Sequence, residues 1–127
     1  MEIPGILKYT FLLHMVIAIG LGIWYFIAPN TWVDLVSWPY FDPSVDRVMA
    51  SLMIGLGVTS LLGYRADSYE KVEIIVIGEI ICCLLSTVGM IWFMLSEATP
   101  PMIGWALTGI MALLLVLFAY SYYVAKK

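Results

Sequence analysis

The sequence predicts an all-α membrane protein: an antiparallel four-transmembrane-helix bundle with a short interfacial helix in the first outer loop. Of its 127 residues, 63% are hydrophobic and only 12% are charged, and the mean hydropathy is +1.00. Soluble domains are about half apolar and a quarter charged, so this composition excludes a soluble enzyme, a disordered tail and a disulfide scaffold. The net charge of -3 argues against nucleic-acid binding, which needs a basic face.

Four apolar windows are long enough to cross a bilayer, which takes about 20 mostly apolar helical residues. They cover residues 9–28, 45–64, 71–95 and 102–123. Together they use most of the chain, so we expect one membrane domain over residues 1–127. The first window is longer than the apolar core of a signal peptide, about 7–15 residues, and we expect it to span as well.

Local signals mark the start of each later helix. Asp42-Pro43 predicts an N-cap followed by proline at the first helical position. Asp67 with Glu70 three residues later predicts a capping box for the third span. Thr99-Pro100 repeats the cap-then-proline pattern before the fourth.

The basic residues predict the orientation, because cytoplasmic loops of membrane proteins are rich in Lys and Arg. With four spans, five basic residues share the side that carries both termini: Lys8, Arg65, Lys71, Lys126 and Lys127. Arg47 alone lies on the other side. We therefore expect both termini in the cytoplasm, and we expect the membrane to be the plasma membrane of a prokaryote.

The first outer loop, residues 29–41, is long and aromatic. Thr31 can cap a short helix with Asp34 at its third position, so that Trp32 shares an apolar side with Val33. This predicts a short helix in the membrane interface. Such a helix can anchor the bundle, or it can act as a lid or docking surface.

Small residues recur at every fourth position in each span, which places them on one helix face and lets helices approach closely in lipid. The four sets are Ser51, Gly55, Thr59 and Gly63; Ala18 and Gly22 in line with His14; Gly78, Cys82 and Ser86; and Gly104, Thr108 and Ala112. We expect packing within the bundle, with a homodimer as the alternative.

Three charged or titratable residues lie inside the predicted spans and away from the loops: His14, Glu79 and Glu73, of which Glu73 is closer to the inner interface and can reach water. His14 lies about 9 Å beyond Lys8 and Glu79 about 12 Å beyond Lys71 at helical rise, so both have similar depth. A carboxylate in hydrocarbon is costly unless it is paired, protonated or hydrated. Cys82, Cys83 and Ser86 continue a polar stripe from Glu79. The stripe and His14 predict either a ligand or proton site, or hydrogen bonds that fix the bundle.

No spacing of ligands or nucleophiles predicts catalysis. Cys82 and Cys83 are adjacent and form no CxxC motif, and one histidine with them and Glu79 does not make a metal-ligand pattern. We expect no metal and no cofactor. On the outer side, Arg47 can form an ion pair with Asp46 or Asp42, or bind an anionic group below the aromatic loop.

The first half of the chain resembles the DoxX-like group of small four-span membrane proteins. The resemblance rests on Gly22-Ile23-Trp24-Tyr25-Phe26-Ile27-Ala28-Pro29, Asp42-Pro43, Arg47, Gly55-Leu56-Gly57 and Leu61-Leu62-Gly63. It implies a four-helix bundle, and some members of the group are small subunits linked to quinone-coupled respiratory oxidoreductases. No catalytic residue carries over.

These observations favour a non-catalytic accessory or assembly subunit of a larger membrane complex, for which a respiratory complex is one option. The alternative is an autonomous binder or proton-linked carrier of a small lipophilic molecule that uses Glu79 and His14. The expected partners are the lipid bilayer and either proteins of a membrane complex or a second copy of the chain.

Overall fold

The computed structural model describes residues 1–127 as five α-helices and one short 3₁₀ helix, with no strands. The elements are α1 (Gly5–Ile27), α2 (Pro29–Val36), α3 (Pro43–Arg65), η1 (Tyr69–Lys71), α4 (Glu73–Ser96) and α5 (Met102–Lys126). Four of them, α1, α3, α4 and α5, are long and apolar enough to cross a membrane. The predicted four-helix membrane bundle with a short helix in its first outer loop is confirmed.

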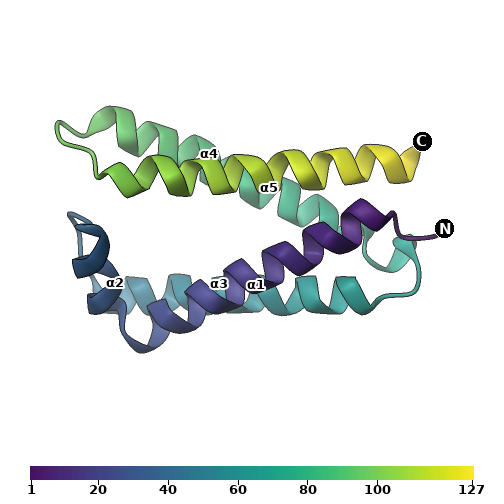
Figure 1. Cartoon of the computed structure of the whole chain (residues 1–127), viewed down its shortest axis with the longest axis horizontal. Coiled ribbons are helices and arrows are strands. Elements are labelled where there is room, and N and C mark those ends of the chain that lie inside the picture. Colours follow the sequence, from purple (N-terminus) through teal and green to yellow (C-terminus); the bar gives the residue numbers. More distant parts are fainter.

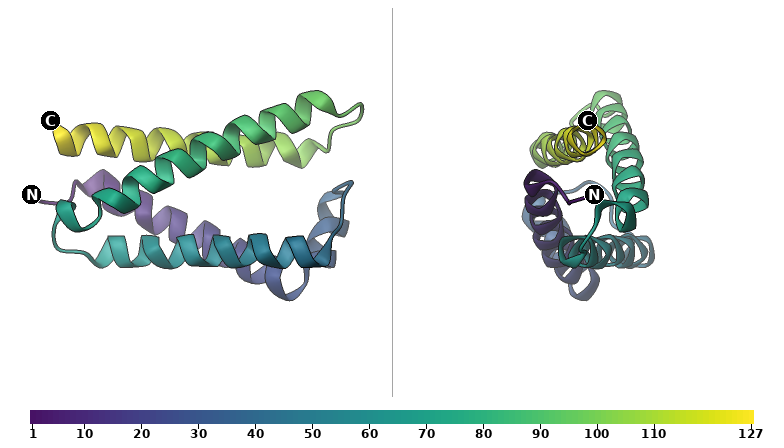
Figure 2. Two further views of the ribbon diagram at one scale, coloured as in Figure 1. Left: turned by 180° about the vertical axis from the view of Figure 1, so that it is seen from behind. Right: turned by 90° about the vertical axis from the view of Figure 1, so that its right-hand side faces the viewer.

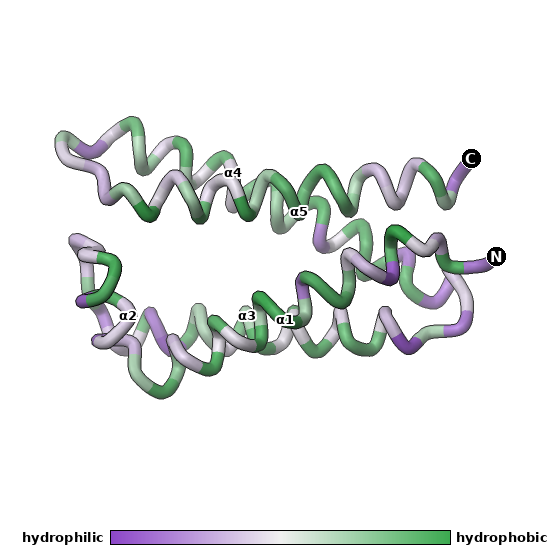
Figure 3. The backbone as a smooth tube through the Cα atoms, viewed as in Figure 1, coloured by the Kyte–Doolittle hydropathy of each residue, from purple (hydrophilic) through white to green (hydrophobic).

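Both termini lie at the same end of the bundle, here called the termini end, and α2 lies at the opposite end, here called the α2 end (Figure 1). The long helices are mostly hydrophobic along their length, and hydrophilic residues are more frequent near their ends (Figure 3). Many large apolar side chains point outward, among them Val16, Leu52, Ile74 and Val116. This surface suits a hydrocarbon environment, and the protein is a membrane protein.

The predicted cap of α3 is confirmed. The Asp42 carboxylate accepts hydrogen bonds from the amides of Ser44 and Val45, at 3.0 and 3.2 Å. These bonds and the Ser44 hydroxyl, which has the largest effect, hold the pKa of Asp42 below its ordinary value. Pro43 occupies the first helical turn, where its missing N–H costs nothing.

The other predicted caps are wrong. Asp67 forms an ion pair with Lys71 instead of capping a helix, and α4 begins only at Glu73. Between α3 and α4 the chain forms η1, where the Tyr69 amide donates to the Met1 carbonyl at 2.9 Å. Local sequence does not reveal this contact. Before α5, Pro101 keeps Pro100 out of the helical region, so the helix starts at Met102.

The short helix also begins earlier than expected. Pro29 is its first residue, and Thr31 lies inside it with its hydroxyl bonded to the Ala28 carbonyl. The helix ends at Val36, and the C-cap residue Ser37 adopts a left-handed conformation with φ of 54°. Its placement directly after α1 fixes Trp24 against Thr31, whose hydroxyl accepts the indole N–H at 2.8 Å.

The four long helices form two pairs, α1 with α3 and α4 with α5, which separate toward the α2 end (Figures 1 and 2). Close approach within the first pair depends on glycine. A Cβ at Gly57 would lie 2.5 Å from Ile19 Cγ1 and 3.1 Å from the Ile19 backbone nitrogen. The two pairs meet near the termini end, in a core that includes Leu7, Phe11 and Phe118.

The small-residue face of α3 differs from the predicted one. Ala50, Gly57 and Ser60 are buried, whereas Ser51 and Gly55 are exposed. Gly63 is the only member of the predicted set that is buried. Both sets have helical spacing, and only the position of α1 decides between them.

Candidate binding site

A cavity of about 720 Å³ lies between the two helix pairs, in the half of the bundle toward α2. It is lined by 21 residues, of which 17 are hydrophobic. Each long helix contributes, and Trp32 and Trp38 contribute from α2 and the following loop. The volume falls within the range of about 300–1,000 Å³ that is usual for small-molecule sites.

A buried polar cluster lies at the inner end of this cavity, midway along the bundle. Nδ1 of His14 is 2.7 Å from the hydroxyl oxygen of Ser60 and 3.4 Å from Oε1 of Glu79. The exposed fractions of the three residues are 7%, 0% and 1%. The structure therefore brings His14 and Glu79 together from α1 and α4, at the similar depth that their sequence positions indicate.

The Glu79 carboxylate has unused hydrogen-bonding capacity. Neither oxygen has a hydrogen-bond partner, because the 3.4 Å approach of His14 lacks hydrogen-bond geometry. Buried polar atoms are normally hydrogen-bonded, and each exception invites an explanation. Glu79 is also among the residues that line the cavity, so these free acceptors lie next to the space that a bound molecule would occupy.

The predicted polar stripe on α4 faces the same cavity. Cys82, Cys83 and Ser86 all line it, and both thiols are free. Cys83 is 3% exposed and lies near Glu79 on the next helical turn, while Cys82 is partly exposed. No three side chains of His, Cys, Asp or Glu are grouped as metal ligands.

Aromatic residues close the α2 end of the cavity. Trp38 stacks on Phe93 of α4 with ring centroids 5.2 Å apart and an angle of 25° between the planes. The Tyr40 hydroxyl donates to Glu97 Oε1 at 3.0 Å, and this bond raises the pKa of Tyr40. The segment after α2 thus bridges the two helix pairs, above the apolar part of the cavity. This position fits the predicted lid, and it also anchors the bundle.

The predicted outer ion pair is absent. Asp46 points inward, where its Oδ1 accepts a 2.7 Å hydrogen bond from Tyr25 and its Oδ2 has no partner. Arg47 instead donates from Nε to the Phe26 carbonyl at 3.2 Å and forms no ion pair with Asp46 or Asp42. Adjacent helical residues point about 100° apart, so Asp46 and Arg47 reach different surroundings.

Two residues of the site were missed by the sequence analysis. Ser60 was overlooked because the set of Ser51, Gly55 and Thr59 has the same helical spacing on a neighbouring face of α3. Tyr25 was named only within the segment that carries the DoxX-like resemblance, yet it lines the cavity and bonds to Asp46. No local pattern signals either contact, because each joins α1 to α3 across the bundle.

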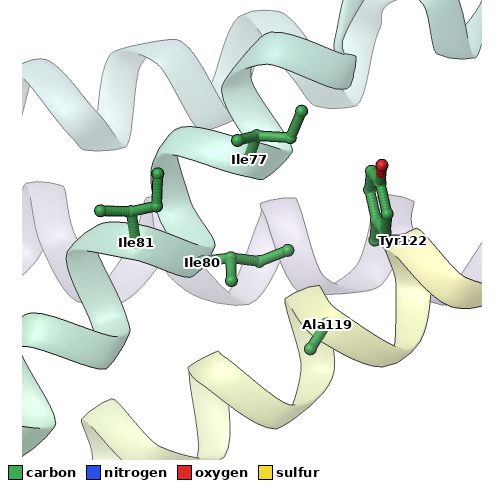
Figure 4. A pocket seen from close by; sticks show the side chains of 5 residues that line it. All are labelled: Ile77, Ile80, Ile81, Ala119 and Tyr122. Atoms are coloured by element: carbon green, nitrogen blue, oxygen red, sulfur yellow. The ribbon is translucent and has the colours of Figure 1, made fainter.

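A second, smaller hollow of about 430 Å³ lies on the side of the bundle between α4 and α5 (Figure 4). All five lining residues are hydrophobic: Ile77, Ile80, Ile81, Ala119 and Tyr122. It holds no buried polar group that could orient a ligand, so the larger cavity is the candidate site.

Comparison of the chain with models of known protein families, with curated proteins and with solved structures found no match. The resemblance to the DoxX-like group therefore stays a prediction.

Proposed function

We propose that this protein binds a small lipophilic molecule within the membrane, in the cavity between the two helix pairs. One observation carries the proposal: a mostly apolar cavity of about 720 Å³ has the buried polar cluster of His14, Ser60 and Glu79 at one end. Ligand sites combine mostly apolar walls with a few placed polar groups in this way. The cluster supplies orientation and the walls supply contact area.

The arrangement favours a ligand with one polar head and an apolar body. The head would meet Glu79 and His14 at the inner end, and the body would extend toward Trp32 and Trp38. From His14 to Tyr25, which lines the far end, α1 rises about 16 Å at 1.5 Å per residue. Helices α1, α3, α4 and α5 all contribute walls, so the site is formed by the folded bundle as a whole.

We also propose that both termini face the cytoplasm of a prokaryote and that the membrane is its plasma membrane. This rests on the basic residues, because Arg65, Lys71 and Lys126 share the termini end and Arg47 stands alone near the α2 end. The rule that Lys and Arg stay on the cytoplasmic side supports this orientation. Labelling of single cysteines introduced at each end of intact cells would test it, in a variant that lacks Cys82 and Cys83.

A second candidate function is that of an accessory subunit in a larger, respiratory membrane complex. Its support is the outward small-residue surface of α3 and α4, where Ser51, Gly55 and Gly78 are exposed. A Cβ at either glycine would meet nothing within 4 Å. Close helix contacts in lipid use such surfaces, and a partner subunit or a second copy would fit here. The predicted DoxX-like resemblance agrees with this function.

Native mass spectrometry after gentle extraction from the cell membrane tests both functions. Gly89 lines the cavity and has no atom within 4 Å of an added Cβ, so Gly89→Phe is the variant chosen to place a bulky side chain at the site. Gly109 has equally free surroundings but lies outside the cavity, so Gly109→Phe is the matched control.

We expect a small molecule to be retained by the wild type and by Gly109→Phe, and to be lost from Gly89→Phe. Equal adducts on all three proteins would contradict binding in the cavity. A foreign subunit present in stoichiometric amount, with an empty cavity, would favour the accessory role instead.

A further inference from the structure

We infer that the ligand is a lipophilic amine whose ammonium head binds the carboxylate of Glu79. This inference rests on the proposed binding function and names its ligand class. It depends on the charges that line the cavity, on the free oxygens of Glu79, and on the position of the apolar walls.

The cavity carries one carboxylate, and the only basic residue that lines it is His14. No lysine or arginine is among its 21 lining residues, and Glu79 is the only carboxylate. The nearest titratable partner, His14, already shares a 2.7 Å hydrogen bond with Ser60 through the nitrogen that faces Glu79. Complementary charge selects partners, so this cavity favours a cation and disfavours an anion.

Three of the six lysine and arginine residues have partners outside the cavity. Lys71 pairs with Asp67 and Lys126 with Glu73, both at the termini end. Arg47, near the α2 end, donates to a backbone carbonyl of α1. None of them is available to neutralise Glu79.

The unpartnered hydrogen-bond acceptors of Glu79 match the donors of an ammonium group. An ammonium has three donors and no acceptor, whereas an ionised carboxylate only accepts. Both Glu79 oxygens are buried without a hydrogen-bond partner, so they can take two of these donors. Glu79 is already removed from water in the folded protein, at 1% exposure, so a ligand does not have to dehydrate it.

The apolar walls of the cavity determine which chemistry suits the rest of the ligand, beyond its polar head. Beyond the polar cluster, the cavity is bounded by Leu, Ile and Met side chains and by the indoles of Trp32 and Trp38. A second polar head would find few partners there: the Ser86 hydroxyl and the Tyr25 hydroxyl, which is bonded to Asp46. A ligand with a single amine and an unbranched or flat apolar body fits this distribution.

The test uses three ligands that share a chain and differ in the head: decylammonium, decanol and decanoate. Each is titrated into the full-length protein in nanodiscs of zwitterionic lipid, and occupancy is read by native mass spectrometry against Gly89→Phe. We expect decylammonium to bind about tenfold or more tightly than decanol, as for a charge-assisted hydrogen bond, and decanoate to bind most weakly. In Glu79→Gln the preference for the amine over decanol should vanish.

The outcomes separate this inference from the function on which it rests. Equal or tighter binding of decanol or decanoate to the wild type overturns the amine assignment and leaves lipophilic binding standing. If none of the three binds the wild type more than Gly89→Phe, both the assignment and the proposed function fail. The ranking on the wild type decides the inference even where Glu79→Gln does not fold.

Discussion

Replacement of Gly57 by alanine should weaken the α1–α3 pair that holds His14 against Ser60. An added Cβ would lie 2.5 Å from Ile19 Cγ1, 3.1 Å from the Ile19 nitrogen and 3.3 Å from the Cβ of Ala18. The Ile19 side chain can rotate, but its backbone nitrogen cannot move without shifting α1. The two helices must therefore separate by a few tenths of an ångström.

The matched control is Gly55→Ala, two residues earlier on the same helix. Gly55 is exposed, and a Cβ there meets nothing within 4 Å. Alanine is favoured over glycine within a helix by about 0.5–1 kcal/mol, and both variants gain this term. Only Gly57→Ala also incurs the cost of overpacking, about 1–3 kcal/mol. The free energies of unfolding of the two variants should therefore differ by about 1–3 kcal/mol.

The assay is reversible unfolding in mixed detergent micelles, followed by tryptophan fluorescence and near-ultraviolet circular dichroism. We expect the order Gly55→Ala, wild type, Gly57→Ala, from most to least stable. Decylammonium binding to Gly57→Ala should weaken as well, because the shift of α1 moves His14 relative to Glu79. A Gly57→Ala variant as stable as Gly55→Ala would refute the close packing of α1 on α3.

Three further predictions concern single side chains. Ser60→Ala removes the hydrogen-bond partner of His14 Nδ1 at a buried position. We expect the free energy of unfolding, measured in the same micelles, to fall by about 1–3 kcal/mol. An unchanged free energy would show that another group bonds to His14. Asp42 has a lowered pKa, so the stability from its cap is present above its ordinary pKa and is lost as the pH falls through the lowered value. In thermal denaturation, Asp42→Asn should keep most of the cap but lose part of this acid sensitivity, and an unchanged pH profile would contradict the cap. Glu97→Gln should lower the raised pKa of Tyr40 toward its ordinary value, because it removes the negative acceptor of the Tyr40 hydroxyl, and NMR of ¹³C-labelled tyrosine would measure the change.

The helical content and the number of spans follow from local properties of the chain. Hydrophobic windows of sufficient length predict the four spans, because a bilayer requires every backbone polar group to bond within its own segment. The Asp42-Pro43 cap is equally local, since it depends on atoms two and three residues apart. The similar depth of His14 and Glu79 also follows from counting residues along helices.

Which helix face packs inward was decided by the tertiary structure alone. On α3, the exposed Ser51 and Gly55 and the buried Gly57 and Ser60 have equally suitable spacing, and in lipid an apolar or small residue is tolerated on either face. The turn before α4 likewise includes a contact of Tyr69 with Met1, a residue far away in the sequence. Hydropathy and capping rules do not contain such information.

The candidate site depends on both the sequence and the tertiary structure. The sequence by itself determined that an intramembrane histidine and carboxylate exist and that they share a depth. Only the tertiary structure decided that they meet beside Ser60, that both oxygens of Glu79 stay free, and that Asp46 faces Tyr25 rather than Arg47. The physical reason is that the cavity arises where the pair α1–α3 diverges from the pair α4–α5. That divergence is a property of contacts between helices far apart in the chain, and no single helix encodes it.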